Sequence, residues 1–233
     1  MLNFTVWKRV MNLDFTRVFK EAIPLLLEGT KTTIGIAIIS IIAGLFVGFV
    51  SCLMGMSKNP ILRAISKAYV WIIRGTPMIV QAFFVFYAIP QFFPGVTPSP
   101  FVSGFVTLTL NAGAYLSEII RGGIQAVPVG QTEAARSLGL SAFKTKMKVV
   151  LPQAFKIAIP SMVNQFIISV KDTSILSVIS LNEIVNNAKK AIGMNYRFFE
   201  TYIVVAVFYL VIISALMVLS NYIEKRMNSE RKG

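Results

Sequence analysis

The sequence of 233 residues contains no histidine and only one cysteine, Cys52, which lies inside an apolar run. One cysteine cannot form a disulfide within the chain, and without histidine there is no His/Cys metal site. The same absences leave few groups for nucleophilic or general acid–base chemistry. We therefore expect no metal ion, no cofactor and no catalytic residues.

Charged residues are also scarce, at 14% of the chain, and the acidic residues number 10 against 23 basic ones. Hydrophobic residues make up 55%, and the mean hydropathy is +0.69. A soluble domain does not carry this much apolar surface, so the composition indicates an integral membrane protein. The basic residues flank apolar runs, a pattern better explained by anionic lipid and membrane topology than by nucleic acid. The N-terminus lacks the apolar core and small-residue cleavage site of a signal peptide, so we expect no removable leader.

Long stretches without charge predict an all-α bundle of about five transmembrane helices. The spans are expected at residues 34–56, 61–90, 101–122, 157–180 and 201–223. Four prolines and Gly95, between positions 90 and 100, separate the second span from the third. The second span is interrupted at Arg74, Gly75, Thr76 and Pro77. Because proline removes a backbone donor, we expect a kink there.

The expected organisation is one transmembrane domain, 23–226, between an N-terminal segment, 1–22, and a cytoplasmic tail, 227–233. The N-terminal segment mixes aromatic and basic residues, which suits either a helix in the membrane interface or a frayed tail. Placing the polar loop of about 123–150 inside gives thirteen basic residues inside and eight outside. This bias predicts an N-terminus outside and a C-terminus in the cytoplasm.

Polar residues follow one face of the third and fourth predicted spans. In the third span, spacings of three and four align Thr107, Asn111, Ala114, Glu118 and Arg121. In the fourth span one face carries Ser161, Gln165, Ser169 and Asp172, with Asn164 and Lys171 beside it. A charge at the centre of a spanning helix costs about 2.5 to 3.5 kcal/mol, so these faces should look into the bundle.

These polar residues have two interpretations. They line the path of a polar, charge-bearing solute, or they hold helices and subunits together by hydrogen bonds. The candidate path residues are Asn111, Glu118, Asn164, Gln165 and Asp172. The candidate gating or structural residues are Arg74, Thr76, Pro77, Gln81, Arg121 and Lys171. Glu118 also suits an ion pair with Arg121, Lys171 and Asp172 suit either role, and Arg74 could satisfy loosened carbonyls or attract a carboxylate.

The stretch 130–152, between the third and fourth spans, is polar and basic. Glu133 to Leu138 should form a short helix that Thr132 caps, because its residues include good helix formers. Gly139 can supply a left-handed stop, and Ser141 can cap a second helix that carries three lysines. A short helix at the cytoplasmic end of a membrane bundle is well placed to receive force from another protein.

This stretch resembles the EAA motif of bacterial ABC-importer permeases. The residues that carry the resemblance are Glu133, Ala134, Ala135, Gly139, Val149, Leu151 and Pro152. In that family the loop is the coupling helix, which docks into a groove of the ATPase subunit. The resemblance therefore implies that Glu133, Ala134, Ala135 and Gly139 couple the chain to an ATPase.

The resemblance extends to the permeases for polar amino acids, those of the glutamine, histidine and arginine type. The matching runs are 73–77 with Gln81, 111–115 with Glu118 and Arg121, 164–165, 171–174 and 206–209. Ala112 stands where the pattern has a serine, so that position is not counted as a substrate contact. The resemblance implies a second permease subunit, two cytoplasmic ATPases, an extracytoplasmic amino-acid-binding protein and a place in the bacterial cytoplasmic membrane.

The chain has no phosphate-binding Gly-rich motif ending in Gly-Lys-Ser/Thr, so ATP hydrolysis would belong to a partner. The expected function is that of a permease subunit in an ATP-driven importer. It would carry a polar L-amino acid, glutamine-like, by alternating access. One alternative is an ion-coupled secondary amino-acid transporter in which Glu118, Lys171 and Asp172 are the coupling groups. An intramembrane enzyme and a non-transporting assembly subunit are the others.

Overall fold

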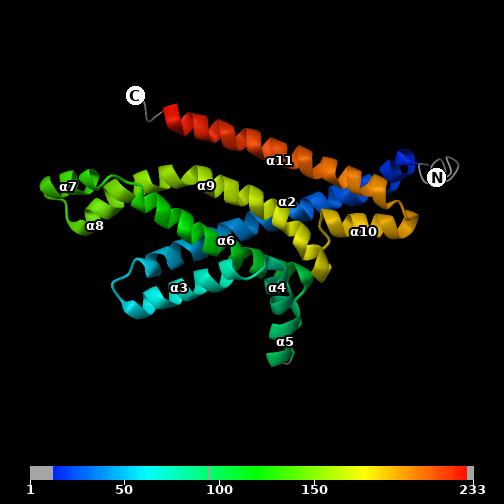
Figure 1. The fold of residues 1–233 in the computed structure, drawn as a ribbon, viewed down its shortest axis with the longest axis horizontal. Coiled ribbons are helices and arrows are strands. Elements are labelled where there is room, and N and C mark those ends of the chain that lie inside the picture. Colours follow the sequence, from blue (N-terminus) through cyan, green and yellow to red (C-terminus); the bar gives the residue numbers. More distant parts are fainter. Residues whose placement is uncertain (1–12, 94, 230–233) are drawn as a thin grey trace, which may run out of the picture.

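The computed structural model describes residues 13–93 and 95–229, which form helices and no strand. The first helices are α2 (Phe15–Gly55), α3 (Pro60–Gly75), α4 (Met78–Phe83), α5 (Ile89–Phe92) and α6 (Pro100–Gln125). The others are α7 (Val129–Ser137), α8 (Ala142–Thr145), α9 (Leu151–Asp172), α10 (Ile184–Asn195) and α11 (Phe198–Ser229). Two π-helical turns, Phe84–Ala88 and Lys146–Val150, and a 3-10 helix, Thr173–Ile179, continue α4, α8 and α9. The long helices run roughly lengthwise, with α7 and α8 at one end and α10 at the other (Figure 1).

Helix α2 begins at Phe15. The residue before it, Asp14, caps the helix by accepting a hydrogen bond from the backbone N–H of Arg17 at 3.0 Å. Residues 15–22 of the predicted N-terminal segment are therefore continuous with the first span. For residues 1–12, the prediction of an interfacial helix or a frayed tail lies outside the described residues. The division into 1–22, 23–226 and 227–233 stays a prediction.

Small residues let α2 and α6 pack closely against each other. The buried stripe of α2 includes Gly29, Thr33, Ala37, Ser40, Gly44, Gly48 and Ser51. A Cβ atom added at Gly48 would lie 2.8 Å from the carbonyl oxygen of Gly113 on α6. The absence of a side chain at this position is what allows the two backbones to meet.

Three described helical stretches are long and apolar enough to cross a membrane: Phe15–Gly55, Ala142–Ile179 and Phe198–Arg226. A fourth is added if the bent pair Pro60–Gly75 and Met78–Phe92 counts as one span. Helix α6 has 26 residues, about 39 Å at 1.5 Å per residue, and contacts both α2 and α9. It is not apolar enough to be counted with those four, because buried polar residues such as Thr107, Asn111 and Ser117 interrupt its apolar sequence. These four stretches and α6 overlap the five predicted spans in chain order.

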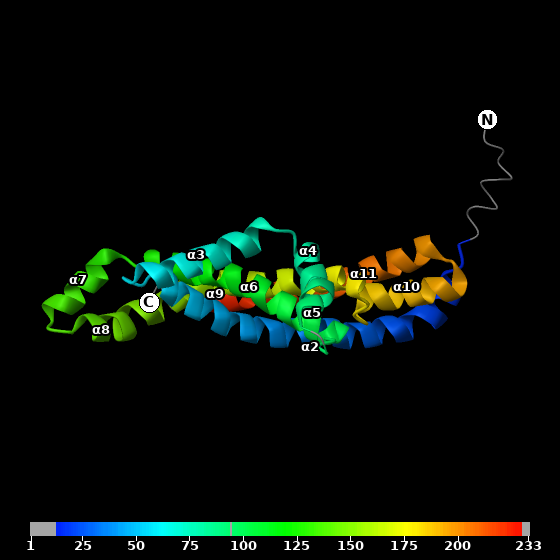
Figure 2. The same ribbon diagram turned by 90° about the horizontal axis from the view of Figure 1, so that it is seen from below.

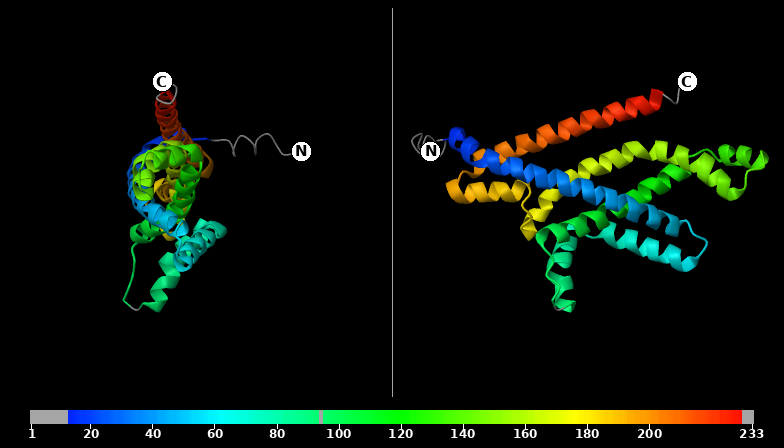
Figure 3. Two further views of the ribbon diagram at one scale, coloured as in Figure 1. Left: turned by 90° about the vertical axis from the view of Figure 1, so that its left-hand side faces the viewer. Right: turned by 180° about the vertical axis from the view of Figure 1, so that it is seen from behind.

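The second predicted span is not one kinked helix. Helix α3 ends at Gly75, and the α4–α5 segment leaves it at 107°, standing away from the bundle (Figures 1 and 3). The backbone is extended at Thr76 (φ −120°, ψ 144°), and Pro77 has no N–H to continue the helix. The predicted position of the break is confirmed, but the prediction of a single helix over 61–90 is wrong.

Helix α10 was not predicted from the sequence. It buries Ile184, Ala188 and Ala191 in a cluster formed with Val18, Ala22, Leu26, Val204 and Val205. These residues come from the beginnings of α2 and α11, so α10 ties together the end of the molecule opposite α7 and α8 (Figure 2).

Candidate functional site

The break between α3 and α4 is held by the side-chain amide of Gln81. Its Nε2 donates to the carbonyl oxygens of Ile73 and Thr76, at 2.7 and 3.0 Å, and to Thr76 Oγ1 at 3.0 Å. Thr76 Oγ1 in turn donates to the carbonyl of Ile72 at 2.8 Å. Carbonyls at the end of a helix lack helical partners, and Gln81 and Thr76 supply them here. Broken backbone at membrane depth is tolerated where protein or water satisfies its polar groups, as these side chains do here.

Asn111 joins helix α6 to this break. Its Nδ2 donates to Gln81 Oε1 at 3.2 Å, and its side chain is buried. Three residues singled out in the sequence, Thr76, Gln81 and Asn111, therefore form one hydrogen-bonded cluster. Their separation of 35 positions along the chain is closed by the packing of α4 on α6.

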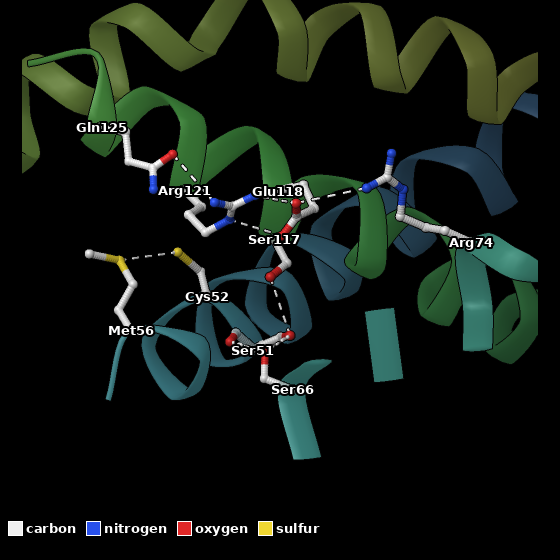
Figure 4. A network of polar contacts seen from close by, with 9 residues as sticks. All are labelled: Ser51, Cys52, Met56, Ser66, Arg74, Ser117, Glu118, Arg121 and Gln125. Carbon is white, nitrogen blue, oxygen red and sulfur yellow. Dashed lines mark hydrogen bonds and ion pairs between the residues drawn. The ribbon is translucent and has the colours of Figure 1, made fainter. Parts of the chain in front are cut away.

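Glu118 on α6 is shared by two arginines. Arg121 Nε donates to its carboxylate at 3.1 Å, and Arg74 Nη1 lies 3.8 Å from Oε2 (Figure 4). Arg121 also donates to Gln125 Oε1 at 3.3 Å, and the guanidinium of Arg74 stands over the ring of Tyr115, 5.1 Å from its centroid. The pairing of Glu118 with Arg121, expected from the sequence, is present, and Arg74 extends it from α6 to α3.

A cavity of about 780 Å³ opens beside this ion cluster, between α2, α3 and α6. Its charged lining residues are Arg63, Lys67, Arg74, Glu118 and Arg121. Three serines that line it connect the three helices by hydrogen bonds. Ser66 Oγ on α3 donates to the carbonyl of Ser51 on α2 at 2.7 Å, and Ser117 Oγ on α6 donates to Ser51 Oγ at 3.2 Å (Figure 4). The cavity thus combines several cations, one carboxylate and hydroxyl groups, a lining suited to a small polar solute.

The candidate residues of the fourth span lie apart from this cluster. Gln165 is buried, Asp172 is half-buried, and Asn164 and Lys171 are exposed. The ion pairs among the described residues lie elsewhere, and none joins Lys171 to Asp172. The role of these four residues in a solute path stays a prediction.

The stretch between the third and fourth spans folds into α7, a turn and α8 at one tip of the molecule (Figures 1 and 2). Gly139 adopts φ +81°, which confirms the left-handed stop, and Ser141 Oγ accepts the N–H of Lys144 at 3.3 Å, which confirms the second cap. The predicted cap at Thr132 is wrong, because α7 already begins at Val129 after Pro128. An early start is natural there, since the fixed φ of proline suits the first position of a helix or the residue before it.

Large apolar side chains are exposed at this tip. Leu138, Phe143 and Val129 are 84%, 73% and 71% exposed, although the stretch around them is polar. Of the four residues expected to meet an ATPase, Glu133, Ala134 and Gly139 are exposed and Ala135 is buried. Exposed apolar groups rimmed by polar residues mark protein interfaces, so the tip has the character of a docking surface.

Glu183 is a fully buried carboxyl group that the sequence analysis did not single out. It caps α10 by accepting the N–H groups of Val185 and Asn186 at 2.9 and 2.7 Å, and it also accepts the hydroxyl of Tyr209 at 3.3 Å. Burial raises the pKa of Glu183 to about 7, against the lowering effect of these hydrogen bonds. Gly29 on α2 allows the close contact, since a Cβ there would lie 2.8 Å from the Cα of Ile184. The sequence signal for this cap was a glutamate directly before Ile184, where apolar residues with helical spacing begin.

Apolar helices packed around a cavity with polar lining are the features of a membrane-embedded transport subunit. The chain belongs to the family described as binding-protein-dependent transport system inner membrane component, whose model matches residues 48–229. The glutamine transport system permease protein GlnP of Escherichia coli (strain K12) is 36% identical over 217 residues, covering 93% of this chain and 99% of that protein. The L-cystine transport system permease protein TcyB of Bacillus subtilis (strain 168) is 40% identical over 206 residues, covering 88% and 87%.

A solved structure supports the same conclusion. The crystal structure of an amino acid ABC transporter with histidines matches this fold with a TM-score of 0.88 and 35% identity. The match covers 93% of this chain and 100% of that one. The predicted fold class and the predicted family are therefore confirmed.

Proposed function

We propose that this chain is the permease subunit of an ATP-driven importer for a polar L-amino acid of the glutamine type. Relatives named for glutamine and cystine transport support an amino-acid substrate. The carboxylate and ammonium groups of an amino acid also suit a cavity lined by both arginine and glutamate. We place the chain in the bacterial cytoplasmic membrane, with its N-terminus outside and its C-terminus in the cytoplasm.

The observation that carries the proposal is the tip formed by α7 and α8. Glu133, Ala134, Ala135 and Gly139 lie there beside the exposed side chains of Leu138 and Phe143. In the proposed complex this surface docks into a cytoplasmic ATPase, and two ATPases act on two permease subunits. ATP must favour one arrangement of the permease over the other, because a ligand that binds both arrangements equally shifts nothing.

The proposed path passes the break between α3 and α4. Asn111, Glu118, Asn164, Gln165 and Asp172 contact the substrate or its water, whereas Arg74, Thr76, Pro77, Gln81, Arg121 and Lys171 shape or gate the path. A second permease subunit, identical or related, completes the walls. Helix α3 carries exposed apolar side chains, such as Ile61, Trp71 and Ile72. In the membrane, the second subunit covers these side chains or lipid contacts them. An extracytoplasmic binding protein delivers the amino acid.

The proposal is tested by reconstituting the chain with its ATPase and binding protein in liposomes and measuring uptake of labelled amino acids. We expect uptake that requires ATP and the binding protein and that is strongest for a glutamine-type substrate. Uptake that persists without ATP but collapses with a proton or sodium gradient would establish the ion-coupled mechanism instead. No uptake of any amino acid by the complete complex would leave an assembly role.

A further inference from the structure

Three cations lie on one face of helix α3. Arg63, Lys67 and Arg74 are spaced by four and seven residues, which places them in one stripe along the helix. All three line the 780 Å³ cavity, as does Arg121 on the facing side of α6. The stripe runs from the break at Gly75 to the first turns of α3, toward the end of the molecule that carries α7 and α8 (Figure 1).

These cations are only partly compensated. Among the described residues, Glu118 is the one carboxylate that lines the cavity, and its contacts are with Arg121 and Arg74. Arg63 and Lys67 take part in no ion pair within the described part of the chain. Four cations facing one carboxylate leave the cavity positive, and the two outermost cations are available to an anion that enters it.

Basic residues near the cytoplasmic end of a span have a simpler explanation, since they orient the chain in the membrane. That explanation requires no cavity and no common face. Lys58 fits it, because it is exposed in the turn between α2 and α3 and does not line the cavity. Arg63 and Lys67 differ from Lys58 in pointing into the same space as the ion cluster at the break. This difference gives them a role beyond topology and provides a matched control.

We propose that the cavity is the cytoplasmic exit of the substrate path and that Arg63 and Lys67 receive the α-carboxylate of the departing amino acid. The inference rests on the proposed function and adds an exit site and a selection rule to it. A zwitterion with a neutral side chain can place its carboxylate against these cations. An amino acid with a second positive charge is repelled by the same groups, so the cavity disfavours cationic substrates.

The test is equilibrium binding of labelled L-glutamine and of its α-amide to the nucleotide-free permease–ATPase complex in phosphatidylcholine nanodiscs. The double variant Arg63→Gln/Lys67→Gln should bind glutamine about 2- to 30-fold more weakly, as expected for two exposed charge interactions. It should bind the α-amide, a cation that has no carboxylate, at least as tightly as the unaltered complex does, because the repelling charges are removed, and Lys58→Gln should leave the binding of both ligands unchanged. Correct assembly is checked by the amount of ATPase that copurifies with each variant.

Several outcomes would overturn the inference. They are unchanged glutamine binding by the double variant, equal loss for glutamine and its amide, and no saturable binding of glutamine to the unaltered complex. A binding change that appears only when phosphatidylglycerol is present would instead identify the cations as a site for a lipid phosphate. ATP-driven uptake by the unaltered full complex, measured in parallel, separates the two proposals. If uptake is normal and the binding prediction fails, only the exit site is wrong, whereas absence of amino-acid uptake refutes the proposed function.

Discussion

Asn111 donates a hydrogen bond to the side-chain carbonyl of Gln81 at 3.2 Å, while the amide nitrogen of Gln81 satisfies the broken end of α3. One glutamine therefore connects three elements: the end of α3, the start of α4 and the middle of α6. At this 107° bend, the carbonyl groups of Ile73 and Thr76 accept hydrogen bonds from Gln81. In the proposed mechanism, the substrate path passes this break beside the Arg74–Glu118 pair.

Replacing Gln81 should loosen this break. Gln81→Ala removes the partner of the Ile73 and Thr76 carbonyls, and we expect a loss of about 1 to 3 kcal/mol in stability. The measurement is thermal unfolding of the purified protein in detergent, together with uptake by the reconstituted complex. Gln91→Ala on exposed α5 is the control and should unfold like the unaltered protein. Equal stability of the two variants would show that the amide is not what holds the break.

Gly139 should not tolerate a side chain. Its φ of +81° is a conformation that an L-residue adopts only at a cost of about 1 to 2 kcal/mol, so Gly139→Ala should distort the turn between α7 and α8. We expect substrate-stimulated ATPase activity and uptake to fall while the amount of protein in the membrane stays the same. Gly130→Ala in α7 is the control, because nothing lies within 4 Å of an added Cβ and its φ is not positive. If substrate stimulated the ATPase activity of the Gly139 variant fully, the conformation of this turn would not be needed for coupling.

The contact between α2 and α6 should be sensitive to a single methyl group. Gly48→Ala places a Cβ 2.8 Å from the Gly113 carbonyl oxygen, and such overpacking typically costs about 1 to 3 kcal/mol. Gly35→Ala, on the same helix, adds its Cβ to open space and should be neutral or slightly stabilising. Thermal unfolding of the two variants compares them directly. If the Gly48 variant were as stable as the Gly35 variant, α2 and α6 could move apart enough to accept the methyl group without loss of folding stability.

Glu183 predicts a pH dependence of stability. Its pKa is raised from an ordinary value of 4.5 to about 7, with Lys189 as the nearby cation and Tyr209 as the facing hydroxyl. The unfolded chain therefore releases this proton at lower pH than the folded one. The contribution of protonated Glu183 to folding stability is complete below about pH 4.5 and is lost as the pH rises to about 7. Melting temperatures should fall between pH 5 and pH 8 more for the unaltered protein than for Glu183→Gln. Parallel pH profiles would show that the group is already ionised in the folded state.

The sequence was sufficient wherever a feature depends on neighbouring residues. Charge-free runs located the spans, and the local backbone chemistry of Pro77, Gly139 and Ser141 located a break, a turn and a cap. The pairing of Glu118 with Arg121 could also be predicted, because residues three apart on a helix are neighbours.

The features that sequence reasoning missed depend on contacts between distant residues. The angle of the break is fixed by hydrogen bonds of Gln81 with α3 and α6, which no local pattern reveals. Helix α10 was missed because it lies between two predicted spans, although Ile184, Ala188 and Ala191 have helical spacing. The burial of Glu183 follows from the contact of Gly29 with α10, more than 150 residues away along the chain.

In the proposed complex, the tip formed by α7 and α8 lies in the cytoplasm in contact with an ATPase. The most direct measurement is cross-linking from Leu138→Cys in a chain whose own buried cysteine is removed by Cys52→Ser. The account predicts a cross-link to the ATPase subunit and labelling of this cysteine only by reagents that reach the cytoplasmic side. Labelling from the extracytoplasmic side, or no cross-link to the ATPase in an assembled and transporting complex, would contradict it.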